Sequence, residues 1–128
     1  MFNSEDIYTA LNVAGITALL DDYEASTTVK ALFDGIIIPQ DFTGTESINF
    51  YMSGTFLAGM EYGNYRYSIN CRSADYEDSR IMADMVIDSI NRVSYPDHYI
   101  VCSVLQTIPP QDDTDVFNTP VEAILKKR

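Results

Sequence analysis

The chain has 128 residues, a formal net charge of −11 and a sequence pI of about 4.1. This length suits one domain with a core of its own, and a hydrophobic content of 46% argues against disorder over most of the chain. Binding nucleic-acid phosphates requires clustered Lys and Arg side chains, so the charge argues against a nucleic-acid-binding groove, although not against an acidic wall that DNA merely passes.

The first residues, MFNSEDIY, lack the basic and apolar regions of a signal peptide, and no apolar run approaches the ~20 residues of a membrane helix. We therefore expect a soluble protein that folds in a cytoplasm and makes no membrane contact. Cys71 and Cys102 lie in apolar strand patterns, which favours buried free thiols over a disulfide.

The first predicted element is a helix from Ser4 to about Tyr23, which Ser4 caps and whose first turn carries Glu5 and Asp6. Its apolar residues fall on two stripes, where a surface helix shows one. Either both sides are buried, one in the core and one against a partner, or loops of the same chain cover the second side. The stripes are Ile7, Leu11, Ala14 and Ala18, and Val13, Ile16, Leu20 and Tyr23.

Three strands are predicted in the next part of the chain. Ile36–Pro39 reads as a short strand closed by proline, and residues 47–53 and 65–72 both alternate strictly, which predicts an antiparallel pair. The connection Gly54–Asn64 holds three glycines and more large apolar side chains than a water-exposed loop usually carries. It either folds back on its own domain or, as we favour, docks on another subunit. The large residues are Phe56, Leu57, Met60 and Tyr62.

A second amphipathic helix is predicted from Asp75 to Val93, followed by strands over 99–108 and 116–125. Met82, Ala83, Val86, Ile87, Ile90 and Val93 form the stripe that should pack on the sheet. Ile81 and Met85 fall at the edge of the polar face and are incidental or part of a contact surface. Pro120 indicates a sheet edge or a bulge. The element order predicts a single α+β domain: a mostly antiparallel β-sheet with two main helices packed on it.

Few residues suggest catalysis. His98, the one histidine, lies in a predicted turn and is expected to be exposed and inert. The chain contains no phosphate-binding loop, no dinucleotide fingerprint and no zinc-ligand set. Asp112, Asp113 and Asp115 are spaced as Ca²⁺ ligands can be, but without the glycine and glutamate of an EF-hand they are more typical of a solvated acidic turn. The nine tyrosines suit an interface or cross-strand pairs.

The segments ESINFYMSG and EYGNYRYSINCRSADYEDSRIMADMVIDSINR resemble the tail completion, or tail terminator, proteins of long-tailed bacteriophages. The resemblance covers most of the chain, including the closing TPVEAILKKR, and marks residues 1–128 as one tail-terminator-like domain. It implies a small α+β subunit that forms a ring, commonly a hexamer. Such a ring caps the finished tail tube, ends its polymerisation and provides a surface for joining the head, without catalytic residues, cofactors or metals.

The resemblance also implies the partners. These are further copies in a homo-oligomeric ring, a tail tube protein below and a neck or head-completion protein above, with genome DNA passing through an acidic bore without specific binding. The location would be the tail or neck of a virion assembled in the cytoplasm of a bacterial host. The candidate residues for the subunit or tube interface are Ile7, Leu11, Phe56, Leu57, Met60, Tyr62, Ile81 and Met85.

Three alternatives stay open at this point. The chain is a head-completion or neck adaptor protein, a small metal-dependent enzyme that uses Asp112, Asp113 and Asp115, or a bacterial adaptor module that binds another protein.

Overall fold

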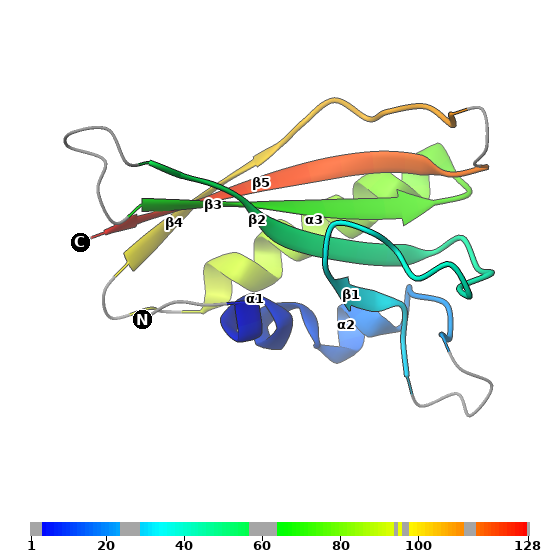
Figure 1. Ribbon diagram of the computed structural model, residues 1–128, viewed down its shortest axis with the longest axis horizontal. Helices are drawn as coiled ribbons and strands as arrows, with labels where there is room; N and C mark the ends of the chain where they lie inside the picture. The colour runs from blue at the N-terminus through cyan, green and yellow to red at the C-terminus, as the bar shows by residue number, and fades with distance from the viewer. Residues whose placement is uncertain are drawn as a thin grey trace.

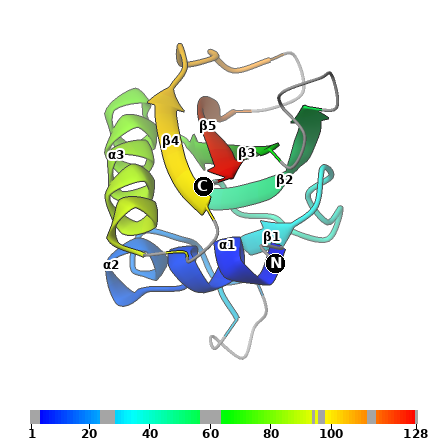
Figure 2. The same cartoon turned by 90° about the vertical axis from the view of Figure 1, so that its left-hand side faces the viewer.

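The computed structural model describes residues 4–23, 29–56, 64–93, 95, 98–111 and 115–127. Five strands form one sheet in the order β1-β2-β3-β5-β4, in which only β1 and β2 run parallel. Figure 1 views this sheet with α3 behind it, and Figure 2 shows α3 along one side of the molecule and α1 across another. The predicted α+β class, with a mostly antiparallel sheet, is confirmed. The elements are α1 (Ser4–Leu11), α2 (Ala14–Thr17), β1 (Leu32–Asp34), β2 (Ser47–Phe56), β3 (Asn64–Ser73), α3 (Tyr76–Arg92), β4 (His98–Val104) and β5 (Phe117–Lys127).

The predicted hairpin is present as β2 and β3, with Ile48 opposite Cys71 and Phe50 opposite Ile69. These four side chains are buried, because strict alternation directs them all to the face that α3 covers. The ladder shifts its register between Met52 and Gly54, which marks a bulge in β2.

Helix α3 also follows its prediction, except that Val93, predicted to end the stripe on the sheet, is 41% exposed just beyond the helix. The Asp75 carboxylate accepts a hydrogen bond from the Asp78 backbone N–H at 3.2 Å and so caps the helix. Met82, Ala83, Val86 and Ile90 are buried against the sheet, as their helical spacing requires.

The first helix is shorter than predicted. α1 ends at Leu11, Val13 has extended backbone angles (φ −120°, ψ 151°), and α2 is a separate helix of four residues. Asn12, Val13 and Gly15 are weak helix formers, so packing against α3 decides the local path. The Ser89 hydroxyl donates to the carbonyl of Ala10 and ties the end of α1 to α3.

The predicted strand Ile36–Pro39 is wrong. The strand at this place is β1, where Leu32 and Phe33 are buried and pair with Ile48 and Asn49 of β2. The Gly35 N–H donates to the Phe50 carbonyl, after which the chain leaves the sheet. The sequence cannot reveal this, because a parallel pair joins residues that a local pattern does not connect.

Two single-residue expectations also need correction. His98 is buried at the start of β4, with its ring centroid 5.9 Å from that of Tyr65, and not exposed in a turn. Pro120 lies in β5, which runs between β3 and β4 and is not an edge strand. Its missing N–H does little harm there, because β4 ends opposite Val121 and the Pro120 carbonyl accepts from Leu105 at 2.9 Å.

We predict that Met82→Asp prevents folding, because Met82 is 1% exposed in the core and a buried unpaired carboxylate costs several kcal/mol, on the order of the whole stability of a small domain. The measurement is urea unfolding followed by circular dichroism. Ile81→Asp is the matched control: Ile81 is 49% exposed on the same helix, so this variant should unfold cooperatively near the wild-type midpoint. A cooperatively folded Met82→Asp variant would contradict this placement of the core.

Candidate assembly surfaces

Two of the predicted interface residues lie inside the subunit. Ile7 and Leu11 are both 0% exposed and belong to the core cluster with Phe50 and Val86. As the chain is folded, neither offers an atom to a partner, which corrects the expectation that this stripe forms a subunit contact. The exposed large apolar side chains in and beside the N-terminal helices are instead Tyr8, Val13 and Leu19.

The predicted docking loop falls largely outside the described residues. This applies to Leu57, Met60 and Tyr62, while Phe56 ends β2 with only its backbone described, opposite Asn64 of β3. The interface prediction for these four residues therefore stays a prediction.

Ile81 and Met85 occupy different positions on α3. Ile81 is about half exposed, whereas Met85 is partly buried and packs against the core. Met85 reaches α2, where a Cβ atom on Gly15 would lie 3.2 Å from its Cε. The absence of a side chain at Gly15 thus lets α2 approach α3 closely.

Met85 also lines a groove between the N-terminal helices and α3, which we call the helical groove and which has a volume of about 310 Å³. Apolar atoms of Val13, Ile16 and Val93 contribute to its walls, and Asp88 and Arg92 form an ion pair of 2.9 Å at its side. Such a groove suits an apolar side chain of a partner. It is lined by Thr9, Ala10, Val13, Gly15, Ile16, Met85, Asp88, Ser89, Arg92 and Val93.

Among the described residues, the large apolar side chains with the highest exposed fractions follow β1. Ile36 is 69% exposed and Ile37 is 79% exposed, and the Asn49 side chain holds the backbone there by donating to the Gly35 and Ile36 carbonyls at 3.1 and 3.4 Å. The sequence pattern predicted a strand at these residues and not an exposed apolar patch. Their exposure makes them candidates for a contact with another protein.

A second hollow lies where β2 begins and β3 ends, and we call it the Arg72 pocket. It has a volume of about 370 Å³. Its walls combine apolar side chains, hydroxyl groups, one cation and one carboxylate, and no sequence pattern indicated it. It is lined by Ile38, Phe42, Thr43, Gly44, Thr45, Ser47, Arg72, Asp115 and Val116.

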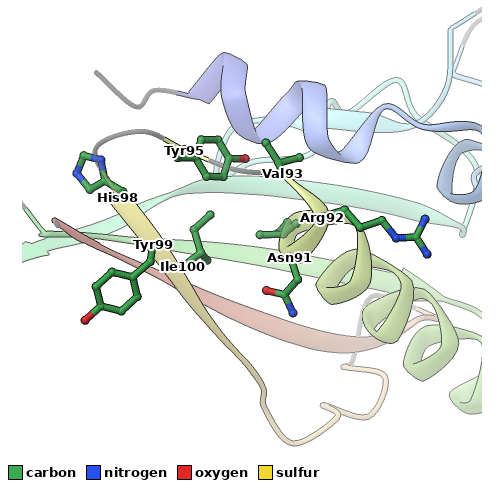
Figure 3. Close-up of a pocket in the computed structure, with 8 residues that line it drawn as sticks. Asn91, Arg92, Val93, Tyr95, His98, Tyr99 and Ile100 are labelled. Atoms are coloured by element: carbon green, nitrogen blue, oxygen red, sulfur yellow. The ribbon is translucent and has the colours of Figure 1, made fainter.

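A third hollow, of about 300 Å³, lies beside the start of β4. Figure 3 shows His98 and Tyr99 on opposite sides of this strand, with Tyr95 among the lining residues. Burial raises the pKa of the Tyr95 hydroxyl to about 12, with smaller contributions from Asp6 and Cys102. Tyr95 therefore remains protonated at neutral pH and is not a general base there. The hollow is lined by Ile90, Asn91, Arg92, Val93, Tyr95, His98, Tyr99 and Ile100.

Metal ligation has little support in the described part of the chain. Among those residues, no three His, Cys, Asp or Glu side chains lie close enough together to hold a metal ion. Asp115 lines the Arg72 pocket, while Asp112 and Asp113 lie outside the described residues. No described helix is both long and apolar enough to cross a membrane.

Comparison with known proteins gives a likeness in fold. No family model and no curated protein matches the sequence. Among solved structures, the fold is similar to a chain of the virion of a native gene transfer agent particle, with a TM-score of 0.57 and 16% identity. The match covers 94% of this chain and 90% of that chain. At this identity the likeness establishes a shared fold across nearly the whole of both chains.

The buried thiols and Tyr95 lead to a prediction about pH. Burial raises the pKa of Cys102 to about 11 from an ordinary value of 9.0, and raises that of the fully buried Cys71 still further. Above pH about 9 the unfolded chain releases these protons while the folded chain keeps them. The free energy of unfolding should therefore be unaffected by these groups below pH about 9 and fall as the pH rises towards about 11.

The measurement is the urea midpoint between pH about 7 and about 11. Tyr95→Phe is the comparison variant, because it removes one of the titrating groups and should make the alkaline decline shallower. A midpoint that stays constant up to pH about 11 would show that the thiols and the phenol are not buried in this way.

Proposed function

We propose that this chain is a structural subunit of a phage-like virion and that it forms a ring, most simply a hexamer, on the end of the tail tube. The ring would stop tail polymerisation and offer its other side to a neck or head-completion protein. The chain would act by assembly and not by catalysis, without a cofactor. It would be incorporated into the tail or neck in the cytoplasm of a bacterial host.

The observation that carries the proposal is the likeness to a virion chain over 94% of this chain and 90% of that one. Because the match covers nearly all residues of both chains, it suggests that the two proteins are subunits of the same kind. The sequence resemblance to tail terminator proteins adds the particular position at the end of the tube.

Surface chemistry supports an assembling subunit. A head-to-tail ring requires two different and complementary patches on each copy. The helical groove lies between α1, α2 and α3, whereas Ile36, Ile37 and the Arg72 pocket lie around the loop between β1 and β2. These patches lie on different elements, so one copy can present different surfaces to its two neighbours. The net charge of −11 suits a bore through which DNA passes without being held.

The proposal is tested by mixing the purified chain with assembled tail tubes from the same source and imaging the tube ends by electron microscopy. We expect a ring at one end only, and we expect deletion of the gene to yield tails of abnormal length. Protein bound to heads but absent from tube ends would instead favour the neck adaptor. A chain that binds neither, with tails of normal length in the deletion strain, would end the virion proposal, and a thermal shift with Ca²⁺, Mg²⁺ or Mn²⁺ would then favour the metal-dependent enzyme.

A second prediction concerns the end of the β2–β3 hairpin. We expect Phe56→Asp to yield a folded subunit that fails to form rings on tubes, because a carboxylate in an apolar contact loses its hydration. Circular dichroism reports the fold and electron microscopy reports the rings. Phe56→Leu is the control and should assemble. If Phe56→Asp does not fold, Phe56 belongs to the core of its own subunit.

A further inference from the structure

The Arg72 pocket contains a half-buried arginine without a hydrogen-bond or ion-pair partner among the described residues. Arg72 is half-buried, its Nε is buried, and its guanidinium makes no hydrogen bond or ion pair with any other described residue. Burial lowers the pKa of the guanidinium, which the nearby Tyr51 partly offsets, but an arginine remains charged at neutral pH. A charge held partly out of water normally has a partner of opposite sign.

Two of the other three described arginines have such a partner, and the third donates a hydrogen bond to a neutral group of its own subunit. Arg66 pairs with Glu122 at 3.7 Å, Arg92 pairs with Asp88 at 2.9 Å, and Arg80 donates to the Thr107 hydroxyl at 3.3 Å. The contrast is notable in a chain with 19 acidic and 8 basic residues.

The walls of the pocket indicate what kind of group would complete it. Ile38 and Phe42 supply apolar surface, and the guanidinium supplies hydrogen-bond donors suited to a carboxylate. Asp115 lines the same pocket, but no ion pair joins it to Arg72. The pocket therefore fits an acidic side chain that stands next to an apolar one.

Such a combination lies on the outer face of α3. Glu77, Ile81 and Asp84 are spaced at i, i+4 and i+7, so they form one row along the helix. All three are exposed, and neither carboxylate has an ion-pair partner among the described residues. We call these three residues the acidic row.

We propose that the acidic row of a second copy of this chain docks on the Arg72 pocket. A carboxylate of Glu77 or Asp84 would accept hydrogen bonds from the Arg72 guanidinium, and Ile81 would pack on Ile38 and Phe42. This inference deepens the proposed function and rests on it, because it names the contact through which copies would join in the ring.

The geometry of the sheet makes this contact head-to-tail. Cys71 faces the core beneath α3, and side chains alternate along a strand, so Arg72 points to the opposite face of the sheet. The acidic row lies on the side of α3 away from the sheet, because Met82, Val86 and Ile90 face the sheet. A copy docked in this way presents its own free Arg72 pocket to the next copy, and such contacts form a ring when the rotation from copy to copy closes.

The test is a charge exchange followed by sedimentation equilibrium. Arg72→Glu should weaken self-association at least about tenfold, because it places like charges against each other in a partly desolvated contact. Asp84→Arg with Glu77→Arg should weaken it similarly, and the triple variant that combines these changes with Arg72→Glu should recover most of the loss. Arg66→Gln is the control, since Arg66 already pairs within its own subunit, and it should associate as the wild type does.

One further variant tests whether Asp115 of the same copy, and not a second copy, is the partner of Arg72. Asp115→Asn should leave association unchanged or stronger, because it removes a carboxylate that competes for Arg72. A loss of association with Asp115→Asn, wild-type association of Arg72→Glu, or failure of the exchanged variant to recover would each overturn the inference.

Assembled particles provide the deciding measurement if the isolated chain sediments as a monomer. Thr43→Cys combined with Ile81→Cys should then give disulfide-linked copies under mild oxidation, because Thr43 lines the pocket. A monomer in solution without cross-linked copies in particles overturns the inference. Rings on tube ends formed by Arg72→Glu would overturn it while leaving the proposed function intact. If the copies associate through Arg72 but the chain never binds tails, the inference about the contact would stand and the proposed function would fail.

Discussion

The central strand β3 fixes the position of nearly everything else in this structure. It pairs with β2 along one side and with β5 along the other, over almost its whole length. A strand hydrogen-bonded on both sides cannot slip by one residue without turning its buried face outward. Tyr67, Ile69 and Cys71 therefore stay beneath the helices, and Arg66 and Arg72 must lie on the other face. The same register that builds the core thus places a cation where a partner can reach it.

A small polar network fixes α3 relative to the sheet. The hydroxyl groups of Ser79 and Thr119 are 2.8 Å apart, and Thr107 lies 2.8 Å from Thr119 on its other side. Because Ser79 and Thr119 are buried, the loss of either hydroxyl would remove a buried hydrogen bond, although Ser79 would keep its bond to the Tyr76 carbonyl and Thr119 its bond to Thr107. The network joins the first turns of α3 to β5 and to the segment after β4. These hydrogen bonds therefore also fix the position of Ile81, which lies two residues beyond Ser79 on the same helix.

The sequence predicts those parts of the fold in which neighbouring residues share one environment. The alternation around Phe50 and Ile69 and the helical spacing from Met82 to Ile90 each reflect burial on a single face, so a local pattern is sufficient. The error at Ile36 arises because β1 is defined by its pairing with β2, and three successive isoleucines imitate a strand. The error at Ile7 and Leu11 has another cause: apolar spacing identifies a buried stripe but does not say whether the same chain or a partner buries it.

The same distinction between local patterns and long-range pairing separates the candidate sites that the sequence can reveal from those that it cannot. Ile81 could be identified from sequence, because its place on a polar helix face follows from spacing alone. The Arg72 pocket could not, since its walls come from the loop before β2, the end of β3 and the residues before β5. The residues next to Arg72 in the sequence do not distinguish it from Arg66, which lies on the same face of the same strand. The difference is that Glu122 stands beside Arg66, and only the pairing of β3 with β5 brings that carboxylate there.

Net charge explains why an unpaired cation matters for assembly. Copies that each carry a charge of −11 repel one another, and this repulsion acts over about a Debye length, or ~10 Å at moderate ionic strength. Lys30, Arg66 and Arg92 are already paired within the subunit, so they do little to offset repulsion from outside. Arg72 has no ion-pair partner among the residues that the structure describes, and it lies in a pocket where screening by salt is weaker than on an open surface. A contact that joins this cation to carboxylates of the next copy relieves repulsion at the point of closest approach, and the apolar side chains of Ile38, Phe42 and Ile81 supply attraction that does not depend on charge.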